Sequence, residues 1–346
     1  MPRRMRVFCW LVAALLLSAA TRHRAAEFIG SHLVERLLAE GHEAVGIDCF
    51  IPYYPRCIKA ANIASFEKKP RFRFCELDLR AGDLTGALEG VDTVFHLAAM
   101  PGLSASWSDF ELYMTCNMLA SQRLLEACRT RDLSAFVHAS TSSVYGREAT
   151  GNEQRPLNPI SPYGATKLAA ERLAVAYHAE FGVPSVVLRY FSVYGPRQRP
   201  DMGYYTFIRR VLRDEPVVIC GDGEQTRGNT YVDDCVSATL LAAARGCPGE
   251  VYNAGGGEAR SVKWVLSTIE ELTGRAAIVE HAPRRPGDQR RTMANIAKLR
   301  RDVGFEPRTP LREGLAAQVA WQRSGCEVSN GAHTADAGVA VIAEQA

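Results

Sequence analysis

Tyr163 and Lys167 are the residues whose types and spacing first indicate chemistry. They lie four positions apart at the start of a segment with helical patterning, so both side chains project from one face of the expected helix. A lysine ammonium beside a phenol favours the phenolate, which lowers the pKa of the tyrosine and suits it to act as a general base. Taken alone, the pair is equally compatible with an ordinary exposed pair on a helix.

The hydroxyl-rich turn Ser140–Gly146 supports the catalytic interpretation. It follows an apolar strand and lies about twenty residues before Tyr163. Ligands of open α/β sheets bind at the carboxyl ends of the strands, so a hydroxyl there lies where a substrate binds. Together with the tyrosine and the lysine, it forms a proton-handling set for an alcohol that is being oxidised.

The elements that position these residues alternate between strands and helices. Apolar spacing predicts a helix over residues 28–40, and Gly41 follows as a residue that ends it. Because strands that alternate with helices of this length form βαβ crossovers, the sequence predicts an α/β fold with a doubly wound parallel sheet. Strands are expected at 44–48, 72–78, 91–97, 135–138 and 185–188, and helices after the third strand and over 163–181.

Beyond residue 190 the pattern loosens into what we interpret as a smaller lobe. Gly-Pro and Gly-Asp-Gly turns separate the expected elements from one another. These are helices near 204–213, 233–245, 261–273 and 311–322 and a strand at 251–253.

The composition excludes several classes of protein. The 346 residues are 47% hydrophobic and 23% charged, which is ordinary globular usage. The net charge is only +3, and the basic residues form no long run along the chain. We therefore expect a small-molecule partner and no nucleic acid. The ten cysteines are scattered without metal-ligand spacing, which is typical of a reduced cytoplasmic protein without a metal site.

Short motifs between residues 28 and 323 occur in the order of a known family. They are F-I-G-S-H-L at 28–33, Asp48, D-L at 78–79, H-L-A-A at 96–99, Asn117, Y-x-x-x-K at 163–167, R-Y-F at 189–191, V-Y-G-P at 193–196, G-D-G at 221–223 with Arg227, Y-V-D-D at 231–234 and R-P-G-D at 285–288. In these motifs the chain resembles the extended short-chain dehydrogenase/reductase family, whose members include NAD-dependent nucleotide-sugar epimerases and dehydratases.

The resemblance implies a division of the chain. An NAD-binding Rossmann-type domain would span residues 28–190, and residues 191–323 would form mainly a substrate-binding lobe. Residues 324–346 are expected to be a flexible tail, after an atypical N-terminal segment at 1–27. Relatives pair through two long helices, here near 107–130 and 163–182, so the resemblance also implies a homodimer.

The resemblance also implies roles for individual residues. Tyr163 would be the general base, and Lys167 would be its partner and a contact of the nicotinamide ribose. Thr141 would bridge the substrate and Tyr163. The expected contacts of NAD are Gly30, Ile29, Asp48 at the adenosine ribose, Asp78 and Leu79 at the adenine, and Ala98.

The resemblance also implies a UDP-sugar substrate and the residues that contact it. Arg227 and Arg285 would clamp its diphosphate, because a guanidinium fork suits phosphate oxygens. Family members that eliminate water or assist decarboxylation carry acids after the threonine, where this chain has Ser142 and Ser143. Without these acids elimination is not expected, and the reaction that remains is oxidation and re-reduction at C4, which is epimerisation. Ser142, Ser192 and Arg199 lie in segments that look most like those of UDP-glucuronate 4-epimerases, with UDP-glucose 4-epimerases as the next most similar.

The first segment departs from the family. Members open with a strand and a Gly-x-x-Gly-x-x-Gly turn whose last glycine aligns with Gly30, which places Arg24 and Glu27 where the other two glycines belong. A side chain at 24 obstructs the tight bend, and a carboxylate at 27 sets negative charge against the cofactor's pyrophosphate. As written, the sequence predicts weak NAD binding.

Three interpretations of this segment stay open. Residues before about 27 can come from a shifted reading frame, which the nucleotide sequence would decide. The run Leu11–Leu17 can replace the missing strand and leave a damaged enzyme. Arg3, Arg4 and Arg6 before the apolar run Val7–Leu17 can mark a signal or anchor, although the run is short for a membrane span. The rival functions are another NDP-sugar oxidoreductase and a silent nucleotide-sugar-binding homologue.

Overall fold

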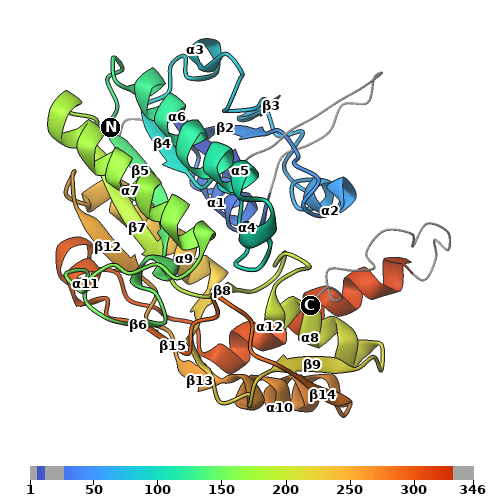
Figure 1. The fold of residues 1–346 in the computed structure, drawn as a ribbon. Coiled ribbons are helices and arrows are strands. Elements are labelled where there is room, and N and C mark those ends of the chain that lie inside the picture. The colour runs from blue at the N-terminus through green and yellow to red at the C-terminus, as the bar shows by residue number, and fades with distance from the viewer. Residues whose placement is uncertain (1–5, 12–26, 330–346) are drawn as a thin grey trace.

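The computed structural model describes residues 6–11 and 27–329 of the chain (Figure 1). They form a large sheet with helices on both faces and a smaller lobe beside it.

Seven parallel strands make the large sheet, in the order β12-β7-β5-β4-β1-β2-β3. Because β1 pairs with both β2 and β4, the strand order reverses there, and the carboxyl ends of the strands meet at one edge. The predicted α/β class with a Rossmann-type sheet is thereby confirmed. The strands are β1 (Arg6–Leu11), β2 (Glu43–Asp48), β3 (Phe72–Glu76), β4 (Thr93–His96), β5 (Ala135–Thr141), β7 (Ser185–Tyr190) and β12 (Val251–Ala254).

The alternation of side chains along each strand decides which helices it contacts. In β7, Val186 and Leu188 pack on one face of the sheet and Val187 on the other. The first face is covered by α1 (Phe28–Ala39), α9 (Val232–Arg245) and α11 (Ala297–Val303). The second is covered by α3 (Leu84–Ala87), α5 (Phe110–Tyr113), the π-helical η1 (Met114–Leu119), α6 (Ala120–Cys128) and α7 (Pro162–Phe181). Two short helices, α2 (Arg56–Ala61) and α4 (Ala105–Ser108), lie in connections.

The first strand lies earlier than the sequence indicates. One interpretation placed it at Leu11–Leu17, but Arg6–Leu11 forms β1, whose backbone pairs with Glu43–Asp48 on one side and with β4 on the other. The apolar run Val7–Leu17 is continuous, so hydrophobicity alone does not decide which part of it pairs, and the partner strands do. Residues 12–26, which include Arg24, lie outside the described residues.

The smaller lobe has its own apolar core. Ile208, Val211, Val265, Ile269 and Leu315 pack together there. They come from α8 (Gly203–Leu212), α10 (Val262–Thr273) and α12 (Leu311–Ser329). The short strands beside them are β6 (Glu148–Gly151), β8 (Val193–Tyr194), β9 (Val217–Cys220), β10 (Thr226–Gly228), β11 (Thr230–Tyr231), β13 (Ala259–Ser261), β14 (Val279–Ala282) and β15 (Arg291–Ala294).

The two parts of the molecule exchange segments along the chain. After residue 190, α9, β12 and α11 return to the large sheet, whereas β6 of the first half pairs with β15. Helix α12 continues to Ser329, past the predicted lobe end at 323, because no proline interrupts it. The rest of the predicted tail, 330–346, lies outside the described residues.

A buried ion pair joins α7 to β7. Arg189 donates to both carboxylate oxygens of Glu171, at 3.0 Å from Nε and 2.6 Å from Nη2, and neither side chain is more than 2% exposed. The Ser140 hydroxyl on β5 donates to the same carboxylate at 2.8 Å, and Arg189 donates to the Tyr145 hydroxyl at 2.7 Å. The two buried charges are therefore paired with each other and hydrogen-bonded to β5 and to the turn that follows it.

We predict that Arg189→Met lowers the free energy of unfolding by about 3–5 kcal/mol, because it leaves the Glu171 carboxylate buried without its counter-charge. Urea titration followed by circular dichroism measures this loss. The matched control is Arg312→Met, which breaks the exposed pair of Arg312 with Glu271 and should cost less than about 1 kcal/mol. Equal losses in the two variants would contradict the prediction.

Candidate active site

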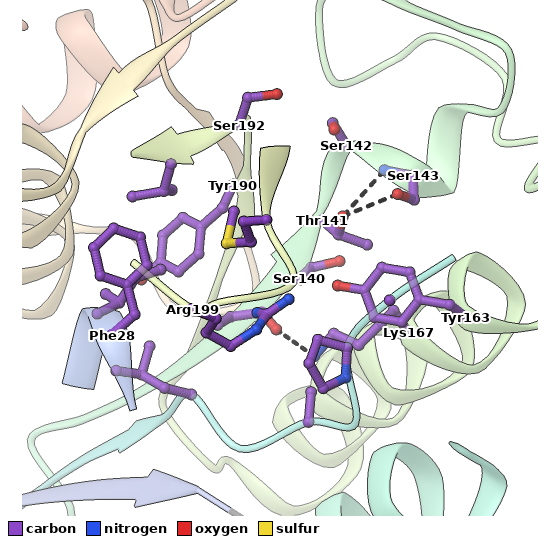
Figure 2. Close-up of a pocket in the computed structure, with 18 of the residues that line it drawn as sticks. Phe28, Ser140, Thr141, Ser142, Ser143, Tyr163, Lys167, Tyr190, Ser192 and Arg199 are labelled. Atoms are coloured by element: carbon purple, nitrogen blue, oxygen red, sulfur yellow. Dashed lines mark hydrogen bonds between the residues drawn. The ribbon is translucent and has the colours of Figure 1, made fainter. Parts of the chain in front are cut away.

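A pocket of about 320 Å³ lies at the carboxyl ends of the central strands (Figure 2). Its walls come from the start of α1, the segment after β4, the turn after β5, α7 and the segment after β7. The parallel sheet brings these distant segments together where the strand order reverses. The predicted site residues that line the pocket are Ile29, Gly30, Thr141, Ser142, Tyr163, Lys167, Ser192, Arg199 and Arg227.

The turn after β5, a 3₁₀ segment η2 (Ser142–Tyr145), and the start of α7 place Tyr163 beside Thr141 (Figure 2). Ser161 caps α7 by accepting a hydrogen bond from the Gly164 N–H at 3.1 Å. A Cβ atom on Gly164 would lie 2.9 Å from the Ser143 carbonyl oxygen, so the helix approaches the turn this closely because residue 164 is glycine. Thr141 Oγ1 accepts from the Ser143 N–H at 3.2 Å, which orients the hydroxyl.

The pKa of Tyr163 corrects one expectation. From its spacing, Lys167 was expected to bring this pKa below the ordinary value. In the structure, burial raises the pKa of Tyr163, and hydrogen bonding with Thr141 and the positive charge of Arg199 lower it by less. Desolvation of the phenolate outweighs the charge of Arg199 in the pocket formed by protein alone, and Lys167 is not among the groups that lower this pKa. Any further positive charge bound there would favour the phenolate.

Lys167 is fixed against β5. Its Nζ atom donates to the carbonyl oxygen of Ala139 at 2.5 Å, and the residue is 2% exposed. Burial lowers the pKa of Lys167 to about 8, while the carboxylate of Glu171, one turn further along α7, acts in the other direction. Lys167 therefore carries a positive charge at neutral pH on the same helix face as Tyr163.

Arg199 brings a second cation into the pocket. Its Nε and Nη2 atoms donate to the carboxylate of Asp201 at 3.0 and 2.9 Å, and the Tyr53 hydroxyl donates to the same carboxylate at 3.1 Å. Burial disfavours the charged guanidinium, but Asp201 holds the pKa of Arg199 above its ordinary value. The charge of Arg199 is thus permanent and its side chain is held by a neighbour.

Gln289 is a pocket residue that sequence reasoning missed. Its Nε2 atom donates to the carbonyl oxygens of Ser142 at 3.2 Å and Gly146 at 2.7 Å, and its Oε1 atom accepts from the Ser142 hydroxyl at 3.3 Å. Gln289 therefore holds the η2 turn in place. The available signal was its position directly after the R-P-G-D motif at 285–288.

One of the two arginines expected to clamp a diphosphate lines the described pocket, and the other does not. Arg227 lines the pocket, and burial lowers its pKa. Arg285 is exposed and is not among the residues that line the described pocket. Asp288 interacts with both arginines, although burial keeps the pKa of Asp288 above its ordinary value.

The predicted ribose contact Asp48 ends β2 and is fully buried. Its Oδ1 atom accepts from the Phe50 N–H at 2.6 Å, and its Oδ2 atom has no partner among the described residues. Burial raises the pKa of Asp48 to about 7, and the charges of Lys59 and Glu27 lower and raise it respectively. A buried carboxylate oxygen without a donor fits a ribose hydroxyl, so this end suits the adenosine of a dinucleotide.

The remaining predicted cofactor residues surround this end without lining the pocket. Asp78 follows β3, where burial raises its pKa but hydrogen bonds from Arg80 bring it below the ordinary value. Leu79 and Ala98 are fully buried in the core beneath α6. Beside Ala98, Ala99 lines the pocket instead.

Asn117 in η1 links the segment after β4 to α7. Its side chain accepts from the Met100 N–H at 2.6 Å and donates to the Met100 carbonyl at 3.2 Å and to Thr166 Oγ1 at 3.0 Å. Thr166 directly precedes Lys167, so Asn117 fixes two pocket walls relative to each other. Single π-helical turns often occur at functional sites.

No helix within the described ranges is long and apolar enough to cross a membrane. Nor do three or more His, Cys, Asp or Glu side chains in those ranges form a group that could hold a metal ion. The cysteines whose side chains are described are free thiols.

Comparison with known proteins gives matches over most of the chain. Residues 25–255 match the NAD dependent epimerase/dehydratase family. The uncharacterized UDP-glucose epimerase YtcB of Bacillus subtilis (strain 168) is 44% identical over 306 residues, which cover 87% of this chain and 96% of that protein. The UDP-glucuronate 4-epimerase of Thermodesulfobacterium geofontis (strain OPF15) is 34% identical over 309 residues, covering 88% and 95% respectively.

A solved structure is similar to this chain in both sequence and fold. The UDP-glucuronic acid 4-epimerase from Bacillus cereus, in complex with UDP-glucuronic acid and NAD, is 41% identical, with a TM-score of 0.85. The match covers 93% of this chain and 99% of that chain. Given these matches and the Tyr163–Lys167 pocket at the edge of a Rossmann-type sheet, the chain belongs to the NAD dependent epimerase/dehydratase family.

Proposed function

We propose that this chain is an NAD-dependent 4-epimerase of a UDP-uronate or UDP-hexose, with UDP-glucuronate as the first candidate. The observation that carries the proposal is the meeting of Thr141, Tyr163 and Lys167 in one pocket beside Ser142 and Ser143, where an eliminating enzyme needs acids. The UDP-glucuronate and UDP-glucose epimerases among the relatives support the same reaction.

The proposed mechanism moves one proton and returns it. The Tyr163 phenolate accepts the proton of the C4 hydroxyl, while the Thr141 hydroxyl holds the substrate oxygen. When bound, NAD⁺ would supply a reversible acceptor for the C4 hydride, so the net reaction would need no external oxidant. The 4-keto sugar rotates in the pocket, so that the hydride returns to the other face of C4. Tyr163 then gives the proton back to the C4 oxygen, and the configuration at C4 is inverted. Arg199 favours the phenolate throughout, and Lys167 keeps a positive charge on the same helix face.

The positions of the carboxylic acids in the pocket argue against elimination of water from the oxidised sugar. Glu27 is the sole carboxylic acid among the described residues that line the pocket, and it lies at the start of α1. Beside Thr141 the walls are formed by Ser142, Ser143 and Gln289. Because elimination of water from the keto sugar needs an acid or base near C5 and C6, the oxidised sugar is left to be reduced again.

Four pocket residues suit the two charged ends of the substrate. Arg227 would contact the diphosphate, since a guanidinium fork matches phosphate oxygens. Ser142, Ser192 and Arg199 would hold a sugar carboxylate through hydroxyl donors and a positive charge. We keep Arg285 as a second proposed diphosphate contact, which requires its exposed loop to turn inward.

We also propose a cytoplasmic homodimer. Trp107, Phe110, Met114 and Leu119 are between 40% and 57% exposed along α4, α5 and η1, and Phe181 at the end of α7 is 49% exposed. A second copy of the chain would cover these side chains, because exposed apolar groups of this size favour burial in an interface. The scattered cysteines suit a reducing compartment, where nucleotide sugars and NAD are supplied.

Tyr163→Phe should lower the rate of epimerisation by about a hundredfold to ten-thousandfold, because it removes the group that takes the C4 proton. The assay follows conversion of UDP-glucuronate and UDP-glucose into their C4 epimers by chromatography. Tyr177→Phe, on the same helix but hydrogen-bonded to Gln122 and Glu126 away from the pocket, is the control. A Tyr163→Phe protein as active as its parent would exclude the proposed base.

The pH profile should depend on Lys167. Because burial lowers the pKa of Lys167 to about 8, the lysine loses its charge as the pH rises through that value, and kcat/KM should fall there. Lys167→Arg keeps a positive charge at these pH values, so the alkaline decline should disappear even if the maximal rate is lower. An unchanged decline in Lys167→Arg would show that another group titrates. Lys298→Arg, at a partly buried lysine that pairs with Glu250 and does not line the pocket, should leave the profile as in the parent.

A further inference from the structure

Glu27 lies where the cofactor pocket meets the first helix. It is the N-cap residue of α1, its side chain accepts no capping hydrogen bond, and it lines the same pocket as Tyr163. The first turn of a helix carries partial positive charge and suits the pyrophosphate of a dinucleotide. A carboxylate at this position should repel that group unless another residue neutralises it.

Lys59 on α2 supplies the neutralising charge. Its Nζ atom lies 3.0 Å from Glu27 Oε1, and the two side chains are 1% and 9% exposed. The same ammonium donates to the Ile51 carbonyl oxygen at 3.3 Å and lies 4.8 Å from the centre of the Tyr54 ring. Burial disfavours a charged lysine, but Glu27 and Asp48 hold the pKa of Lys59 above its ordinary value. The pair is therefore ionic and enclosed.

The ribose end of the pocket depends on the same lysine. Lys59 favours the ionised form of the Asp48 carboxylate, whereas Glu27 opposes it. With Asp48 ionised, the three groups carry one net negative charge, and without Lys59 two buried carboxylates would lose their shared counter-charge. One of them would take up a proton or repel the cofactor's phosphates.

We propose that Lys59 is a positioning residue for NAD⁺: by pairing with Glu27, it makes the atypical start of α1 compatible with dinucleotide binding and leaves Asp48 free to accept a ribose hydroxyl. The proposal rests on the proposed function only in that it takes NAD⁺ as the cofactor. It also opposes the interpretation that the carboxylate at position 27 by itself disables the enzyme.

The test is a double-mutant cycle measured as NAD⁺ affinity by titration calorimetry on protein stripped of bound nucleotide. Lys59→Met in the parent should weaken binding by about a hundredfold, because it leaves Glu27 uncompensated beside the phosphates. In a Glu27→Gln background the same change should cost about tenfold or less, since only the support of Asp48 is lost. Glu27→Gln alone should bind at least as tightly as the parent.

Two comparisons keep the test decisive. If Lys59→Met does not fold, the Glu27→Gln protein and the Glu27→Gln/Lys59→Met protein, which carries no unpaired carboxylate at 27, still give the comparison. Lys263→Met, which breaks the exposed pair of Lys263 with Glu224, should leave NAD⁺ binding unchanged.

The contrary results are distinct from failure of the proposed function. Equal losses from Lys59→Met in both backgrounds, or tighter binding after Lys59→Met, would each overturn the role of Lys59 alone, whereas a parent that binds no NAD⁺ would overturn both proposals. A parent that binds NAD⁺ with the predicted coupling but converts no UDP-sugar would overturn the epimerase function and leave the role of Lys59 standing.

Discussion

The docking of α7 on β5 and β7 through buried polar groups is the constraint on which the site depends. Lys167 donates to the Ala139 carbonyl of β5, and Glu171 binds Ser140 of β5 and Arg189 of β7. These contacts fix both the rotation and the translation of the helix, because charged groups in a dry interior have few acceptable positions. Tyr163, on the same helix face one turn earlier, is thereby fixed in the pocket.

The same contacts set the electrostatics of the reaction. A tyrosine in a buried pocket resists ionisation, and the positive charge of Arg199, whose pKa Asp201 keeps high, opposes this. Lys167 lies on the same helix face as Tyr163, and Glu171 raises its pKa against the effect of burial. Since these carboxylates lie behind the cations, the pocket face near Thr141 stays free of acids. A surface of this kind stabilises a phenolate and a sugar oxygen without providing a group for elimination.

The start of α1 shows how a substitution that is unfavourable locally can be accommodated at a distance. Glu27 opposes a phosphate when only the neighbouring sequence is considered. In the fold, α2 brings Lys59 within 3.0 Å of it, 32 positions further along the chain. The net charge at a site is the sum of the charged residues that all surrounding helices, strands and loops place there. A sequence motif describes the residues of only one of these elements.

The sequence by itself determined the alternation of strands and helices, the family and the pocket residues Thr141, Tyr163 and Lys167, because periodicity and short motifs are local properties. Tertiary structure decided which part of the apolar run Val7–Leu17 became β1, since pairing with two strands selects the register. It also decided that Gln289 lines the pocket while Arg285 is exposed, that burial raises the pKa of Tyr163, and that Glu27 has a partner. Each of these depends on desolvation or on contacts between residues far apart in the chain, which no local pattern contains.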